Sequence, residues 1–225
     1  MPTKYKIGTH DPVIHHDPGA GAWNSKPKTM KMRVSKNEIL EHLTFAYPVI
    51  GDDAVKHMYH YFDNSGLKYT IDLQDMIDDV RNAKIQYNDE VEHAKKFVQT
   101  LPIGTHNIIA STAVRGYNLK EQNWNWFYAV GGYSAWIKGI AKVELDKSGK
   151  HKYRLDYEYK VSDRYNWDIG KQVEIFGVII TDKFMGEFHR QGLAKEFDME
   201  GSIKAAIEWD SINPVHTVVS APKGR

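Results

Sequence analysis

The sequence contains no cysteine among its 225 residues. This absence excludes disulfide bonds, cysteine nucleophiles and thiolate metal sites. No stretch approaches the roughly 18 consecutive apolar residues that a membrane-spanning helix needs. The N-terminus also lacks the apolar segment of a Sec-type signal peptide. We therefore expect that, if this protein leaves the cell, it does so by a route that is independent of a signal peptide.

An excess of charge of either sign is also missing. Lys and Arg number 30 against 29 Asp and Glu, which gives a formal net charge of +1. Global charge therefore predicts no nucleic-acid partner. The glycines of "AVGGYS" do not form a phosphate-binding loop, because no Lys-Ser/Thr pair follows them. A hydrophobic fraction of 41% is ordinary for a soluble globular protein, and this length is sufficient for one sizeable core.

Changes in hydrophobic periodicity divide the chain into four segments. The first mixes Pro, Gly, Asp and His without a period, the second has helical spacing, and the third alternates with a period of two. The predicted segments are an extended N-terminal arm (1–34), a helical subdomain (35–100), an antiparallel β-rich core (101–210) and a C-terminal tail (211–225).

The helical segment begins with "SKNE", in which Ser35 and Glu38 match a capping box. We expect the first helix to start there and to end near Pro48. Helical spacing of apolar residues predicts further helices over residues 52–62, 72–80 and 88–99.

Strands are predicted where apolar and polar residues alternate, most strictly in "YRLDYEYKV". The predicted strands cover residues 106–114, 124–130, 133–145, 153–161, 171–180 and 195–209. The turn residues "DKSGK", from Asp146 to Lys150, are expected to link the third and fourth of these strands as a hairpin. The nearly all-apolar stretch 171–180 is expected to be a central strand, and residues 182–192 a short helix that Asp182 caps. The fold class is therefore predicted as α+β, with a helical N-terminal half packed on a curved antiparallel sheet or half-barrel.

The sequence contains one basic segment and one acidic segment, and their relation is open. Seven Lys or Arg residues lie in 1–36, and seven acids lie in 72–92. The arm could lie against the acidic segment, or both could be independently solvated surfaces.

Polar residues gather in "DRYNWD", at the expected end of the strand over 153–161. Asp163 and Tyr165 are two residues apart and would share a strand face, and Asp168 would follow a turn. Carboxylates near a tyrosine hydroxyl can position water or a metal, or can act as a general base. The alternative is a structural turn, in which Asp and Asn bond their own backbone.

A histidine and an arginine are adjacent in "FMGEFHRQG". Arg190 could bind phosphate in a bidentate manner, and His189 could protonate a leaving oxygen. The alternative is a packed helix with a hydrogen-bonded histidine at its edge. Other candidates are weaker. His57 and His60 have metal-ligand spacing but no third ligand nearby, and the histidines of the arm would not form a preformed site.

Three long strings resemble a family of C-terminal toxin domains carried by type VI secretion effectors and related polymorphic toxins. They are "HYFDNSGLKYTIDLQDMI", "NWNWFYAVGGYSAWIKG" and the block from "YKVSDRYNWDIGK" to "FHRQGLAKEFDMEGS". The resemblance covers about residues 28–210. It implies an antibacterial toxin with a cognate immunity protein and a spike or cage protein of the secretion machinery as partners.

The "DRYN" and "HR" pairs also resemble, more distantly, the Asp-x-Tyr-Asp and His-Arg motifs of colicin M-type domains, which degrade the peptidoglycan precursor lipid II. Asp163, Tyr165, His189 and Arg190 match these motifs. Asn166 replaces the second aspartate, Asp168 lies close to it, and the gap before His-Arg is longer. The resemblance implies a phosphodiester hydrolase. Arg190 and a divalent cation such as Mg²⁺ would neutralise a diphosphate, His189 would be the general acid or base, and Asp163 would hold the metal or water.

We therefore predict an antibacterial effector domain that is delivered by a type VI-like system and acts in the periplasm of a target bacterium. Its predicted site consists of Asp163, Tyr165, Asp168, His189 and Arg190. One alternative is a non-enzymatic toxin that perturbs membranes or blocks a target, which the Trp-rich stretch "WNWFYAVGGYSAWIKGI" suggests. The other is a carrier or adaptor domain without activity.

Overall fold

The computed structural model describes residues 3–167, 172–175 and 178–223, and it confirms the α+β fold class. The helices of this part of the chain are α1 (Met30–Ile50), α2 (Asp52–Asp63), α3 (Leu73–Asp79), α4 (Arg81–Val98), α5 (Trp124–Ala129) and α6 (Asp182–Arg190). The main sheet contains β1 (Tyr5–Ile7), β2 (Tyr69–Thr70), β3 (Gly104–Ala110), β4 (Val114–Tyr117), β5 (Gly132–Leu145), β6 (His151–Tyr165), β9 (Phe197–Asp210) and β10 (Thr217–Lys223).

The eight-stranded sheet is open, with the order β1-β3-β5-β6-β9-β10. Its long central strands β5, β6 and β9 are antiparallel. Among the described strands, the two-residue β2 forms the one parallel pairing, with β9. The sheet is therefore mixed, whereas we predicted a purely antiparallel one. The other described strand pairs of the main sheet are antiparallel, as predicted.

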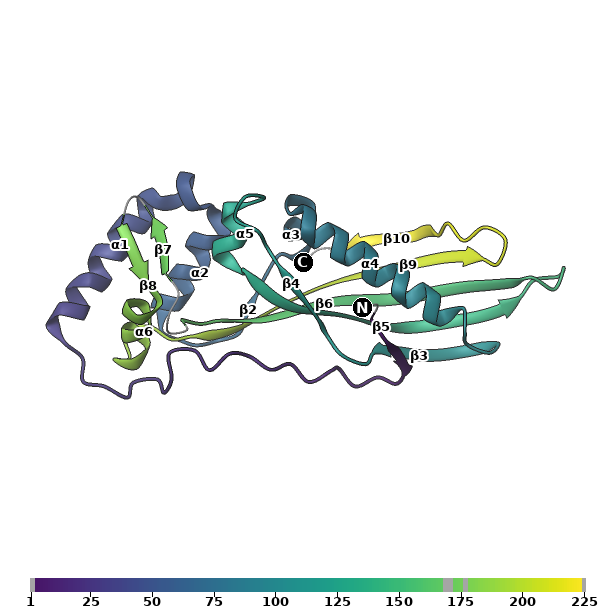
Figure 1. Ribbon diagram of the computed structural model, residues 1–225, viewed down its shortest axis with the longest axis horizontal. Helices are drawn as coiled ribbons and strands as arrows, with labels where there is room; N and C mark the ends of the chain where they lie inside the picture. The colour runs from purple at the N-terminus through teal and green to yellow at the C-terminus, as the bar shows by residue number, and fades with distance from the viewer. Residues whose placement is uncertain (1–2, 168–171, 176–177, 224–225) are drawn as a thin grey trace.

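Alternation along β6 sets which face of the sheet is buried. Every second residue from Tyr153 to Val161 is buried. α3 and α4 pack against this face (Figure 1). The opposite face carries charged side chains such as Arg154 and Asp156. The turn between β5 and β6 is closed by the Asp146 side chain, which accepts hydrogen bonds from the backbone N–H groups of Ser148 and Lys150. The predicted hairpin is therefore confirmed.

The remaining elements gather at one end of the long sheet. There α1, α2 and α6 lie beside a separate two-stranded sheet of β7 (Gln172–Ile175) and β8 (Val178–Thr181) (Figure 1). The chain between β1 and α1 runs along the molecule to reach this end. The N-terminal arm and α6, which are far apart in the sequence, therefore meet where β6 ends.

Two predicted strands are wrong. Residues 124–130 include the helix α5, because the Asn123 side chain accepts a hydrogen bond from the Trp126 backbone N–H and caps a helical turn. Trp126 is fully buried, and its indole N–H donates to Asp79. The stretch 171–180 is not one central strand, because β7 and β8 pair with each other outside the main sheet; Lys171 and residues 176–177 lie outside the described part.

Several boundaries also differ from the predictions. The first helix starts at Met30 because Thr29, not Ser35, caps it, and it continues through Pro48. Thr181, not Asp182, caps α6. The predicted tail contains β10, which pairs with β9. The helices over residues 52–62 and 72–80 are confirmed, and the third is longer than predicted. The division into four domains stays a prediction.

The start of the arm touches the acidic segment through uncharged groups. Thr3 and Tyr5 donate hydrogen bonds to the carboxylate of Glu90, which is buried in α4. The arm lysine with a described ion pair to an acid is Lys26, whose partner is Glu187 in α6. The contact between arm and acidic helix is thus local rather than a neutralisation of two charged surfaces.

In the described residues, no helix has both the length and the apolar character needed to cross a bilayer.

Candidate functional site

The end of β6 carries the first half of the predicted site. Asp163, Tyr165 and Asn166 line one pocket of about 540 Å³, together with residues of β4, α2 and the start of α6. The same pocket is lined by Arg115, Arg164 and Asp182. Two arginines and three aspartates, including Asp17 of the arm, are therefore among the residues that line one cavity at a strand end. Asp168 lies outside the described residues.

Tyr165 contributes to this pocket mainly as a packed ring. Its ring stacks on Phe197 at 5.0 Å between centroids, and its hydroxyl group donates to the Met58 sulfur at 3.9 Å. Burial raises the pKa of Tyr165 well above its usual value, and the nearby Asp182 carboxylate adds to this effect. The hydroxyl group is therefore neutral at physiological pH and is unsuited to act as a base.

Arg115 and Arg164 supply the positive charge of the pocket. Arg115 lies on β4, and its guanidinium group donates to the Ser134 hydroxyl at 3.1 Å. Arg164 pairs with Asp198 at 3.1 Å on the neighbouring strand. Guanidinium groups in fixed positions bind phosphate oxygens in a bidentate manner. Arg115 and Arg164 can therefore contribute to the recognition of an anionic group at this pocket.

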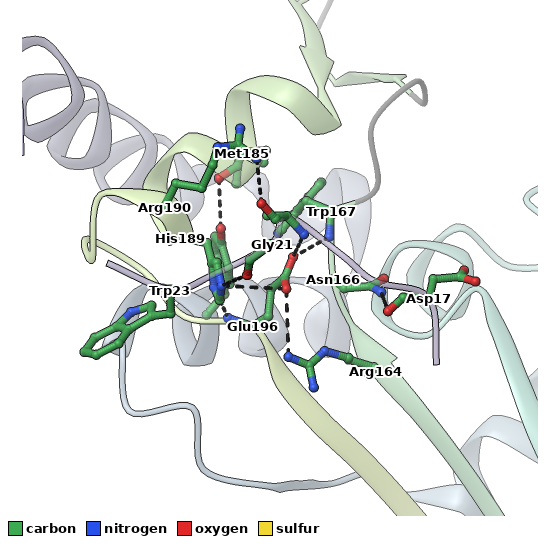
Figure 2. Close-up of polar contacts among 12 residues, drawn as sticks. Asp17, Gly21, Trp23, Arg164, Asn166, Trp167, Met185, His189, Arg190 and Glu196 are labelled. Carbon is green, nitrogen blue, oxygen red and sulfur yellow. Dashed lines mark hydrogen bonds and ion pairs between the residues drawn. The ribbon is translucent and has the colours of Figure 1, made fainter. Parts of the chain in front are cut away.

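The second half of the predicted site lies beside the pocket and not in it. His189 and Arg190 end α6 and are absent from the residues that line the pocket. The His189 side chain is 4% exposed. Figure 2 shows Glu196 between His189 on one side and Arg164 and Trp167 on the other. The structure therefore brings both halves of the predicted site close together, but separates them with Glu196.

Both ring nitrogens of His189 are hydrogen-bonded. Nδ1 accepts from the Glu196 backbone N–H at 3.1 Å, and Nε2 lies 3.0 Å from the Gly21 carbonyl oxygen, to which it donates. Burial lowers the pKa of His189 below its ordinary value, although the Glu196 carboxylate opposes this shift by favouring the charged form. His189 is thus a neutral imidazole, and its one N–H group is committed to the arm.

The guanidinium group of Arg190 is also engaged. It donates to the backbone carbonyl groups of Ala20 and Lys183 at 2.9 and 3.0 Å, and it pairs with Glu187 at 3.0 Å. In this arrangement Arg190 holds the arm and the helix end together. It can bind an anion only if these contacts are exchanged.

Glu196 is the buried acid that sequence reasoning missed. Its side chain is fully buried, and Oε1 accepts from the backbone N–H groups of Ala20 and Trp167 at 2.8 and 2.9 Å. Oε2 lies 3.9 Å from both Arg164 and His189. In the sequence this residue lies at the start of the predicted strand 195–209 and resembles an ordinary surface acid, so no local pattern could have identified it.

Arg115 and Asp182 were missed as site residues for related reasons. Arg115 is separated from Asp163 by 48 positions of sequence and reaches the pocket only because β4 and β6 both flank β5. Asp182 was predicted as a helix cap, but it lines the pocket because Thr181 takes the capping role.

The donor set limits how a divalent cation could bind. Within the described residues, no cluster of three or more His, Asp or Glu side chains could hold a metal ion. Asp163 and Asp182 line the same pocket, and Mg²⁺ is often held by one or two carboxylates plus substrate phosphates and water. The residues therefore fit a cation that arrives with a phosphorylated substrate better than a permanently caged one.

Comparisons with known proteins found no matching family model and no matching curated protein. Two solved structures are similar to this chain. One is PaeM, a colicin M-like bacteriocin produced by Pseudomonas aeruginosa, with a TM-score of 0.41 and 17% identity; the match covers 71% of this chain and 51% of PaeM. The other is truncated bacteriocin syringacin M from Pseudomonas syringae pv. tomato DC3000, with a TM-score of 0.37 and 13% identity; the match covers 71% of this chain and 60% of that one. The matched region therefore spans only about half to three fifths of those bacteriocins.

Proposed function

We propose that this chain is an antibacterial toxin domain that hydrolyses a phosphodiester-containing envelope target, with lipid II as the leading candidate. The observation that carries the proposal is the pocket at the end of β6, which Asp163, Arg115 and Arg164 all line. A pocket lined by an aspartate and two arginines suits attack of water on a diphosphate. The sequence resemblance of "DRYN" and "HR" to colicin M-type motifs supports the same chemistry.

The proposed reaction needs few groups. Asp163 takes a proton from water, the water oxygen forms a bond to phosphorus, and the bond from phosphorus to the leaving oxygen breaks. Arg115 and Arg164 hold the diphosphate and offset its charge. A bound Mg²⁺ would supply additional charge neutralisation at the phosphate oxygens. Once the arm no longer occupies their hydrogen-bonding groups, His189 would take up a proton from solvent and donate it to the leaving oxygen, and Arg190 would bind phosphate.

The proposal includes delivery and partners. A type VI-like secretion system with a spike or cage protein as carrier would bring the domain to the periplasm of a target bacterium, by a route without a signal peptide. A cognate immunity protein would protect the producing cell. The near-neutral net charge of +1 supports the absence of a nucleic-acid partner.

The test is growth of a bacterial host that expresses the chain with or without an added periplasmic signal. Asp163→Asn removes the proposed base with little change in shape. Asp156→Asn is the matched control, because it lies on the same strand and pairs with Arg154 on the open face. We expect killing only from the periplasmic form, and an Asp163→Asn loss of about 100-fold or more. Killing from the cytoplasm, or equal killing by Asp163→Asn, would overturn the proposal.

A second candidate function is direct membrane perturbation. Trp124 and Tyr117 are about half exposed, at 48% and 52%, and Tyr117 lines the pocket. Trp and Tyr side chains favour the interface between membrane and water. This function predicts that the purified protein releases dye from liposomes and that Trp124→Ala reduces the release. The absence of leakage at concentrations that kill would exclude it.

A further inference from the structure

Residues 17–26 cross directly over His189, Arg190 and Glu196, and we call this segment the strap (Figure 2). Its carbonyl groups accept from the side chains of the pair: Gly21 from His189, and Ala20 from Arg190. Its backbone N–H groups also donate to the end of α6, since Asn24 bonds the His189 carbonyl oxygen at 3.1 Å and Lys26 bonds that of Arg190 at 2.8 Å. The strap therefore takes up hydrogen-bonding groups that the His-Arg pair would need for a substrate.

Glu196 anchors the strap through hydrogen bonds to its carboxylate group. Its Oε1 atom accepts from the Ala20 N–H and from the Trp167 N–H, so one carboxylate oxygen joins the strap to the end of β6. The fit is close at Gly19, where an added Cβ atom would lie 2.4 Å from Oε2 of Glu196. Gly19 also has a φ of +63°, in the left-handed region that favours glycine. Only a glycine at this position allows the strap to close over the acid.

The closed strap is held by polar contacts and not by apolar burial. Of residues 17–26, Ala20 is the buried one, and Gly19 is half-buried. Oε2 of Glu196 is buried yet has no hydrogen-bond partner within the described part of the chain. A buried carboxylate oxygen without a donor is unfavourable, and water would satisfy it once the strap lifts. Segments with few buried apolar contacts open at low free-energy cost.

We propose that the strap is a built-in closing device: Glu196 latches it, and it shuts His189 and Arg190 off from solvent and substrate until it is displaced. Glu196 is then a positioning residue and not a catalytic one. The effect on catalysis rests on the proposed function, whereas closure itself does not.

The closing experiment opens the strap without altering His189, Arg190 or Glu196. Gly19→Ala adds a methyl group against Glu196 and a left-handed alanine. Gly149→Ala is the matched control, because Gly149 also has a positive φ, +80°, but its added Cβ would meet nothing within 4 Å in the remote β5–β6 hairpin. Trp23→Ala is a second opening variant. It removes an indole that donates to Asn64 and lies under the Lys195 ammonium group, in case Gly19→Ala does not fold.

The readouts are the rate at which diethyl pyrocarbonate modifies His189 and the hydrogen exchange of the Ala20, Asn24 and Lys26 amides. We expect both to rise about tenfold or more in Gly19→Ala, because a non-glycine residue in the left-handed region lowers the ratio of closed to open strap by about that factor. Gly149→Ala should match the parent chain. Two results would overturn the proposal that the strap closes over His189. One is unchanged His189 reactivity in folded Gly19→Ala and Trp23→Ala, and the other is a reaction in the parent chain as fast as in these variants.

Activity separates this inference from the proposed function. If His189 becomes accessible and cleavage of lipid II accelerates, both hold. If His189 becomes accessible and lipid II stays intact in every variant, the strap holds and the proposed substrate fails. If cleavage is equally fast with the strap open or closed, the strap does not control the site.

Discussion

The two sides of the β6 end differ in what their polar groups are doing. On the pocket side, Asp163, Arg115 and Arg164 are among the residues that line a cavity of about 540 Å³. On the strap side, His189 and Glu196 are buried, Arg190 is half-buried, and all three are bonded to backbone groups. We propose that the pocket side receives a ligand, whereas the strap side holds the chain together. Motif matching alone would have treated the two as one active site.

The difference has an energetic consequence. Replacing a side chain that faces a cavity changes the free energy of unfolding little, because water can take the place of the missing partner. Groups in a buried network leave unpaired donors or acceptors behind, and these cost about 1–3 kcal/mol each. Substitutions on the strap side should therefore lower the stability, whereas substitutions on the pocket side should lower the activity.

The largest expected effect on stability is that of Glu196→Ala. The substitution leaves the Ala20 and Trp167 N–H groups without their acceptor and removes a buried ion-pair partner of Arg164. We expect the free energy of unfolding to fall by about 3 kcal/mol. Denaturant titration measures this change.

Asp198→Ala is the matched control, because Asp198 pairs with the same Arg164 while its side chain is 51% exposed. An exposed pair should contribute about 0.5 kcal/mol or less. If both substitutions lowered the free energy of unfolding equally, the buried contacts of Glu196 would contribute no more to stability than the exposed pair.

The next largest effect is a pH dependence of stability that comes from His57 and not from His189, the other buried histidine. His57 lies 6.0 Å from the Tyr165 ring, and burial lowers its pKa to about 4. Its Nδ1 atom donates to the Asp53 carbonyl group, but Nε2 has no partner in the described residues, unlike either ring nitrogen of His189. Protonation of His57 in the folded state is therefore unfavourable.

Because the folded pKa of His57 is below the unfolded value near 6.5, the unfolded chain binds the proton first as the pH falls. Stability is fully present above pH 6.5 and is lost between pH 6.5 and 4. The loss attributable to His57 should be about 2 kcal/mol between pH 7 and pH 5. In His57→Phe, unfolding measured at both pH values should lack this component. An unchanged pH dependence would exclude His57 as its source.

The smallest expected effect is that of Lys26→Ala. The Lys26–Glu187 ion pair joins the strap to α6 at 2.7 Å, but the lysine side chain is 50% exposed. We expect a change of about 0.5 kcal/mol or less in the free energy of unfolding. Amide exchange at Ala20 should stay as slow as in the parent chain. Fast exchange there would show that surface charge, and not Glu196, holds the strap.

Sequence reasoning succeeded where local pattern decides structure. The alternation in β6 and the turn residues Asp146 to Lys150 predicted the central hairpin, because side-chain direction and turn chemistry are local properties. It failed at α5, where a short aromatic run resembled a strand until the Asn123 cap and the burial of Trp126 favoured a helix. Propensity is weaker than such tertiary contacts.

The site was only partly predictable for the same reason. Asp163 and Tyr165 were identified from their position at a strand end, and both line the pocket. The strap was not predicted, because its contacts join residues about 170 positions apart, such as Ala20 and Arg190, through backbone groups that carry no sequence signal. The roles assigned to His189 and Arg190 stay proposals.

The measurement that tests the central claim most directly is hydrolysis of purified lipid II by the parent chain, Gly19→Ala and Asp163→Asn, with Mg²⁺ present. We predict release of the diphosphate-linked sugar-peptide by the parent chain, faster release by Gly19→Ala, and a loss of about 100-fold or more in Asp163→Asn. Intact lipid II in all three, or equal cleavage by Asp163→Asn, would contradict the account of the pocket as the site of hydrolysis.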